Sequence, residues 1–67
     1  MKRFSKITNQ EYDSADTAAV FRMNQVAFYI EHNVYPIDIF VNDGVLYVIF
    51  LKEDSRDVYK EWCSNKL

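Results

Sequence analysis

The sequence predicts an α+β fold, in which a small antiparallel sheet with a central hairpin packs against two helices in the order β-α-β-β-α. Two β-rich runs, residues 37–42 and 45–51, meet at an Asp-Gly pair, and an amphipathic helical stretch flanks each side of this hairpin. The 67 residues suffice for one domain only. We expect residues 1–18 to form an irregular N-terminal arm, in which a short strand or turn is allowed, and residues 19–67 to form the single small α+β domain.

The hairpin is the clearest signal in the chain. Asp43-Gly44 suits a two-residue turn, which needs positive φ at both central positions. A three-residue loop with a bulge at the glycine is the alternative, and it would move the pairing by one residue. We favour the two-residue turn because it leaves the charged Asp38 outside the core. One face of the hairpin is then entirely apolar, with Ile37, Ile39, Val41, Leu46, Val48 and Phe50.

The other face of the hairpin is the candidate binding site. It carries Asp38, Phe40, Tyr47 and Ile49, so the second strand is apolar on both sides. A sheet with one wet face normally alternates polar and apolar residues, and something must therefore cover part of this face. Either the first helix or the N-terminal arm folds over this face and makes it core, or the face is an exposed patch. We favour partial exposure, because two short helices cannot easily cover both faces and each other. The predicted protein-binding site is Phe40, Tyr47 and Ile49, with Asp38 and Asp43 as an acidic rim.

The remaining elements are placed by capping residues and apolar periodicity. Residues 18–23 are predicted as a strand, Asn24 as the N-cap of the first helix and Asn33 as the residue that ends it. Asp54 or Ser55 is expected to cap the last helix. Its apolar stripe comprises Val58, Tyr59, Trp62 and Cys63.

The N-terminal segment is the least patterned part of the chain. It lacks a periodic apolar pattern, so we expect residues 1–12 to contribute little to stability. It holds the positive charges Lys2, Arg3 and Lys6, whereas the net charge of the whole chain is −2. The acidic body argues against nucleic acid as a partner and favours docking on a basic protein surface.

Few residues could support catalysis or metal binding. His32 and Cys63 are the only soft ligands or strong nucleophile candidates, whereas zinc sites need three or four protein ligands. A phosphate-binding loop needs several glycines, and Gly44 is the only one. We therefore expect no enzyme, no cofactor and no metal. The sequence has no signal peptide pattern and no apolar run that could span a membrane, so we expect a cytoplasmic protein.

A resemblance covers about two thirds of the chain, from Phe21 onward. The matching runs are NQVAFYIEHNVYPIDIFVNDG and VLYVIFLKEDSRDVYKEW. They resemble an uncharacterised family of small proteins from phages and integrative mobile elements of Gram-positive bacteria. The resemblance implies a mobile-element gene product and carries over no catalytic residues.

Two functional hypotheses follow, ranked ahead of a third, a hydrolase or metal-dependent enzyme built around His32 and Cys63. The first is a non-enzymatic protein-interaction module that binds and inhibits a larger protein with a basic surface, of anti-CRISPR or other anti-defence type, with a homodimer as another form of association. The second is a small nucleic-acid-associated regulator. It would place Lys2, Arg3 and Lys6 on phosphates, and Phe40 and Tyr47 on bases.

Overall fold

A computed structural model describes residues 1–65 of the chain. The elements, in chain order, are β1 (Lys2–Ser5), β2 (Gln10–Asp13), a 3-10 turn η1 (Ser14–Asp16), β3 (Thr17–Val20), α1 (Met23–Glu31), β4 (Asp38–Asn42), β5 (Val45–Leu51) and α2 (Lys52–Asn65). The predicted α+β class is confirmed. From β3 onward the order is β-α-β-β-α, and an additional hairpin precedes it. No helix in the described residues is both long enough and apolar enough to cross a membrane.

The main sheet is antiparallel, with β5 between β3 and β4. Asp43 (φ 52°) and Gly44 (φ 76°) form the turn between β4 and β5. Val41 lies opposite Leu46, so the pairing follows the two-residue turn and the predicted register is confirmed.

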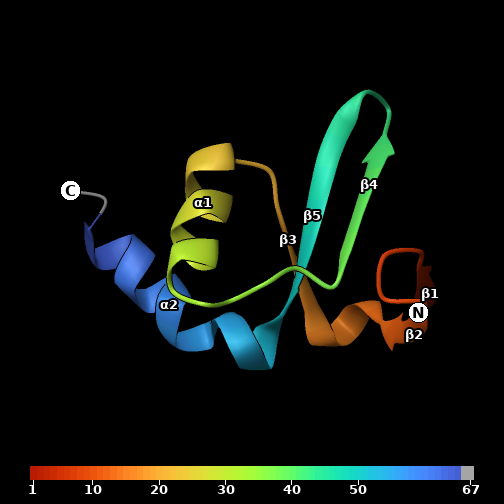
Figure 1. Cartoon of the computed structure of the whole chain (residues 1–67), viewed down its shortest axis with the longest axis horizontal. Helices are drawn as coiled ribbons and strands as arrows, with labels where there is room; N and C mark the ends of the chain where they lie inside the picture. The colour runs from red at the N-terminus through yellow and green to blue at the C-terminus, as the bar shows by residue number, and fades with distance from the viewer. Residues whose placement is uncertain (66–67) are drawn as a thin grey trace.

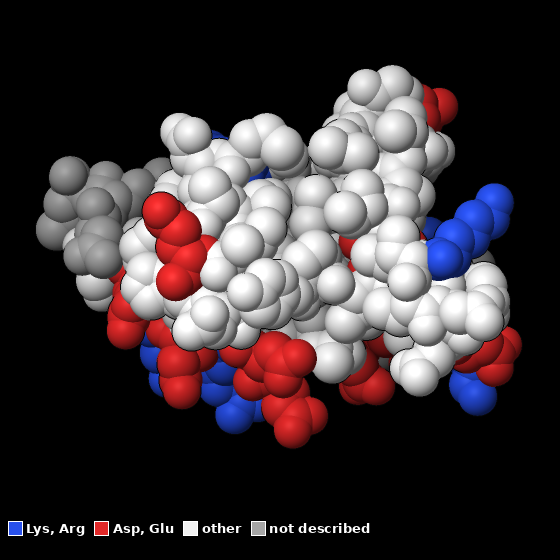
Figure 2. All heavy atoms as spheres, viewed as in Figure 1, with Lys and Arg blue, Asp and Glu red and all other residues white. Residues whose placement is uncertain are grey.

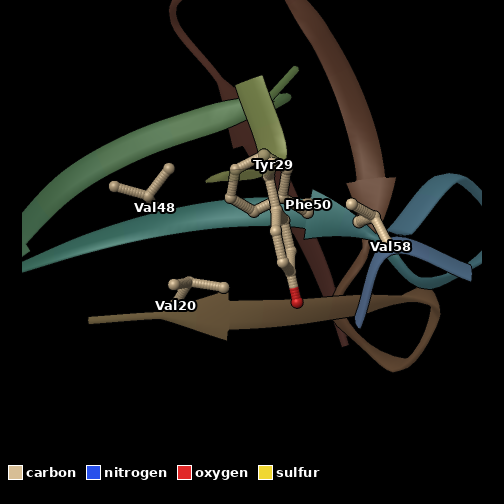
Figure 3. Close-up of a cluster of buried hydrophobic side chains, with 5 residues drawn as sticks. All are labelled: Val20, Tyr29, Val48, Phe50 and Val58. Atoms are coloured by element: carbon tan, nitrogen blue, oxygen red, sulfur yellow. The ribbon is translucent and has the colours of Figure 1, made fainter. Parts of the chain in front are cut away.

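The molecule has three layers (Figure 1). Both helices lie on one side of the main sheet, and the β1–β2 hairpin lies on the other. The core between sheet and helices consists of Val20, Tyr29, Val48, Phe50 and Val58 (Figure 3). At its centre the Tyr29 ring meets the Phe50 ring edge-on, with 4.8 Å between centroids.

The end of α1 follows the sequence expectation. Asn33 adopts the left-handed conformation, with φ 65°. The Val34 N–H donates to the Tyr29 carbonyl and the Asn33 N–H donates to the Ile30 carbonyl, both at 2.9 Å. This pair of bonds is the Schellman motif, which satisfies carbonyls that the helix end would otherwise leave free.

The helix starts differ from the prediction. Arg22, without a side-chain hydrogen bond, occupies the N-cap of α1, so Asn24 lies inside the first turn. Helix α2 begins at Lys52, directly after β5, and therefore already includes Asp54 and Ser55. The Ser55 hydroxyl donates to the Leu51 carbonyl at 2.9 Å instead of capping the helix.

The expectation of an irregular arm over residues 1–18 is wrong. Strands β1 and β2 pair antiparallel over four residues each, and β3 begins at Thr17 and so crosses the expected domain boundary. Side-chain hydrogen bonds tie this hairpin to the sheet. The fully buried Ser5 hydroxyl donates to the Ile37 carbonyl at 2.5 Å and accepts from the Thr8 N–H at 3.1 Å.

Position 44 favours glycine because its φ is positive, and not because a side chain would lack space. A Cβ added there would meet no atom within 4 Å. We expect Gly44→Val to lower the free energy of unfolding by about 1 kcal/mol or more, because a β-branched residue fits positive φ poorly. Urea unfolding measures this change. Gly44→Asn is the control, since asparagine tolerates this conformation and should cost less; equal losses would contradict a conformational cause.

Deletion of residues 1–10 should be destabilising, contrary to the expectation from sequence. The deletion removes β1 and with it the Ser5 contact to the sheet. We expect the thermal midpoint to fall by more than about 8 °C, which corresponds to about 1–2 kcal/mol in a domain of this size. An unchanged midpoint in a calorimetric scan would show that the hairpin adds nothing to the stability of the sheet.

Candidate binding surface

The five predicted site residues differ in how deeply they are buried. Asp38 and Ile49 lie opposite each other in the sheet and are buried, with exposed fractions of 6% and 5%. Phe40 and Tyr47 are half-buried, and Asp43 is exposed in the turn. Asp38 and Ile49 therefore cannot contact a partner without rearrangement, whereas the other three residues keep exposed surface.

The placement of Asp38 outside the core is wrong. Its Oδ2 atom accepts a hydrogen bond from the Tyr12 hydroxyl at 2.5 Å, and its Oδ1 atom accepts from the Ile39 N–H at 2.9 Å. Burial of a carboxyl group is costly unless its oxygens are hydrogen-bonded, and here both are. Burial, together with the hydrogen bond and the charge of Asp38, raises the pKa of Tyr12 to about 12.

The aromatic pair on the same face is held from several sides. The Phe40 and Tyr47 rings stack at 5.2 Å with an interplanar angle of 11°. The Arg3 guanidinium carbon lies over Phe40, 5.4 Å from the ring centroid, and Phe21 meets Tyr47 edge-on at 4.8 Å. Arg3 from β1 and Phe21, which follows β3, thus reduce the ring surface that a nucleic-acid base would need for stacking.

The exposed apolar surface lies on the opposite face of the hairpin. Ile39, Val41 and Leu46 have exposed fractions of 43%, 67% and 39%. These three residues, here called the ribbon face, belong to the face that the sequence predicted as core. Val48 and Phe50 of that face are buried as expected, so the prediction is wrong only for its distal part.

The ribbon face lies where the sheet narrows to two strands. Strand β3 ends at Val20, which pairs with Val48, so β4 and β5 continue as a two-stranded ribbon beyond this point. The ribbon rises past the N-terminal end of α1 (Figure 1). Few charges accompany it. On the face shown in Figure 2, a group of acidic atoms marks the tip of the ribbon and most charged side chains gather along the lower edge, over α2. Asp43 is exposed in the turn between β4 and β5.

His32 and Cys63 do not form a recognisable reactive pair. His32 Nδ1 lies 2.8 Å from the Phe28 carbonyl oxygen, and Nε2 lies 3.4 Å from a Glu61 carboxylate oxygen. Cys63 is exposed, although the apolar stripe of the last helix predicted its burial. In the part of the chain that the structure describes, no three His, Cys, Asp or Glu side chains are placed to share a metal ion.

Two sets of surface residues were missed by the sequence reasoning. The ribbon face was assigned to the core, and no sequence signal shows where the cover of a sheet ends. Lys52, Arg56 and Lys60 were also overlooked, although their spacing of four residues places them in one row of a helix.

Comparison with protein-family models, with curated proteins and with solved structures finds no match to this chain. The resemblance to small proteins of phages and mobile elements therefore stays a prediction. Function is accordingly argued from the geometry of the surface.

Tyr12→Phe tests the hydrogen bond between the Tyr12 hydroxyl and the buried Asp38 carboxylate. The variant leaves Asp38 Oδ2 buried without its donor, so we expect a loss of about 1–3 kcal/mol in the free energy of unfolding. Tyr35→Phe is the matched control, because Tyr35 is 59% exposed, and it should change stability by less than about 0.5 kcal/mol. Similar effects of the two variants in urea titrations would contradict the role of Tyr12.

The same contact predicts a dependence on alkaline pH. The pKa of Tyr12 is raised from 10.0 to about 12, so the folded state holds the phenol proton more tightly than the unfolded state. This contribution to stability is fully present below pH 10 and is lost as the pH rises toward 12. The stability difference between the wild type and Tyr12→Phe should shrink over this interval, and a constant difference would contradict the prediction.

Proposed function

We propose that this protein is a protein-interaction module that inserts its β4–β5 ribbon into a cleft of a larger protein. The observation that carries the proposal is the ribbon face, three exposed apolar side chains on an element that projects beyond the rest of the fold. Contiguous apolar surface on a small protein typically marks an interaction site.

The backbone of the ribbon supports the same conclusion. Beyond Val48, the edge of β5 has no neighbouring strand, because β3 ends at Val20. Unpaired strand edges accept an additional strand from a partner, and the side chains on the strand faces then supply specificity. Both the edge and the apolar face of the ribbon are thus available to one partner.

The surroundings of the ribbon define the chemistry of the partner. Val45, on the opposite face of the ribbon, is 43% exposed, so apolar contacts are available on both faces near the tip. Asp43 is exposed in the turn, and the whole chain carries a net charge of −2. A cleft with apolar walls and a basic mouth complements these features.

A second copy of the chain fits less well than a larger protein. A stable interface buries about 800 Å² on each partner and involves about 20–30 residues a side. The ribbon face offers three side chains, which is far below this size when two flat ribbons meet. A cleft that encloses both faces and an edge of the ribbon makes better use of the same residues.

Inhibition is the consequence that we propose for such binding. A ribbon seated in a cleft blocks access for whatever ligand normally uses that cleft, and this requires no chemistry from the 67-residue chain. The anti-CRISPR or anti-defence role expected from the resemblance is one form of this proposal. It requires a target with a functional cleft of the stated chemistry.

Site-specific photo-crosslinking tests the proposal. A crosslinking amino acid at position 41 should capture one protein from host cells, whereas the same amino acid at Asp57, an exposed position on α2, should not. With the purified partner, the double variant Val41→Ser/Leu46→Ser should bind about 30- to 150-fold more weakly, since each apolar side chain contributes about 1–1.5 kcal/mol when buried.

The controls separate binding from folding. Phe4→Ser/Ile7→Ser changes two equally exposed apolar residues of the N-terminal segment and should leave affinity unchanged. Circular dichroism should show that both double variants are folded. Equal loss in the two variants, or equal capture from positions 41 and 57, contradicts the proposal. Crosslinking to a second copy, with a doubled mass in light scattering, would assign the ribbon to a homodimer instead.

A further inference from the structure

A pocket of about 440 Å³ lies where β3, α1 and α2 meet, away from the ribbon face. Its walls include Ala18 from β3, Tyr29 from α1 and Tyr59 from α2, and most of its lining surface is apolar. Pockets for small organic ligands typically measure about 300–1,000 Å³ and combine apolar walls with a few polar groups. The size and lining of this pocket fit that class.

Three cations border the pocket. Lys52, Arg56 and Lys60 follow one row of α2, separated by about 6 Å along the helix axis at each step. No acidic residue lines the pocket, although Lys52 and Arg56 also border a neighbouring hollow with Asp16 and Glu53. The ion pairs of the described residues involve none of the three cations, so their charges are available to a ligand.

A buried hydrogen-bond donor, Tyr29, belongs to the lining of the pocket. Tyr29 is 2% exposed, and its hydroxyl points past Phe50 toward β3 (Figure 3). This hydroxyl accepts a hydrogen bond from Gln25 Nε2 at 2.9 Å, but no described residue accepts its own proton. Burial raises the pKa of Tyr29, which keeps this proton in place. The hydroxyl can therefore donate to a ligand that reaches it.

We infer that this pocket binds a mononucleotide-sized organic phosphate. Arg56 and Lys60 hold the phosphate, since a guanidinium group can make two parallel hydrogen bonds to it. Tyr59, 53% exposed, offers a ring face on which an aromatic base stacks. The site shares no lining residue with the ribbon face and does not depend on the proposed protein partner.

The shape and charge of the site favour a small nucleotide over two related ligands. An inorganic anion would use the cations but leave the apolar walls unfilled. A nucleic acid strand would need a longer basic track, because its affinity depends on the number of phosphates neutralised. The net charge of −2 works against such a strand, whereas one phosphate needs only the local row of cations.

Titration of the full chain with the four nucleoside 5′-monophosphates, followed by amide chemical shifts, tests this inference. At least one should saturate the protein, with shifts concentrated at Ala18, Tyr29 and residues 52–60. Arg56→Gln should weaken that binding by at least about tenfold. Arg22→Gln is the matched control, because it removes the same charge from an exposed arginine outside this pocket and should leave the affinity unchanged.

Several results would overturn the inference. The absence of saturation by all four monophosphates would remove the site, and equal weakening by Arg56→Gln and Arg22→Gln would reduce it to general charge attraction. If the free nucleoside binds as tightly as its monophosphate, the cations do not contribute to binding. If inorganic phosphate binds as tightly as the monophosphate, the apolar walls do not contribute to binding. A single-stranded oligonucleotide that binds more tightly at the same residues would assign the pocket to nucleic acid.

Discussion

Strand β5 is apolar on both faces, and the rest of the structure depends on covering it. The helices cover one face, where Phe50 is fully buried against Tyr29. The N-terminal hairpin covers the other, where Ile49 is buried. A chain of this size buries only about 60% of the surface that its unfolded form exposes, so it has little apolar surface to spare. Two polar strands therefore serve as the third layer, attached through hydrogen bonds and an arginine–aromatic contact.

Local turn chemistry was enough to predict the hairpin, whereas element ends depended on tertiary packing. Asp43-Gly44 determines its own backbone conformation and with it the register of the two strands. Capping side chains contribute only about 1 kcal/mol each, so continuity from β5 into α2 overrides the preference of Asp54 or Ser55 for the cap. The N-terminal hairpin has no apolar alternation in KRFS or QEYD, and periodicity therefore could not reveal it.

The candidate surface shows the same division between local and distant information. Alternation along the strands correctly assigned which side chains share a face. It could not show that Asp38 finds its hydrogen-bond donor in Tyr12, 26 residues away. Alternation also could not show that the third strand stops at Val20, because the length of β3 and the position of α1 depend on tertiary packing. The predicted core face is consequently exposed at its distal part, and the face predicted as partly exposed is supported by the hairpin.

Under the proposed function, the N-terminal hairpin would link the stability of the sheet to binding by the ribbon. An isolated two-stranded ribbon is at best marginally stable in water, and beyond Val48 the ribbon has no third strand. Arg3 contacts Phe40 of the ribbon from the covered face, and Tyr12 holds Asp38 at the base of the ribbon, where β4 and β5 still have β3 as a neighbour. Both contacts leave the ribbon face free. A ribbon held in its bound conformation loses less conformational entropy on association, and the surplus contributes to affinity. In the proposed complex, contacts on the covered face would therefore influence the affinity of the opposite face, although they touch no partner themselves.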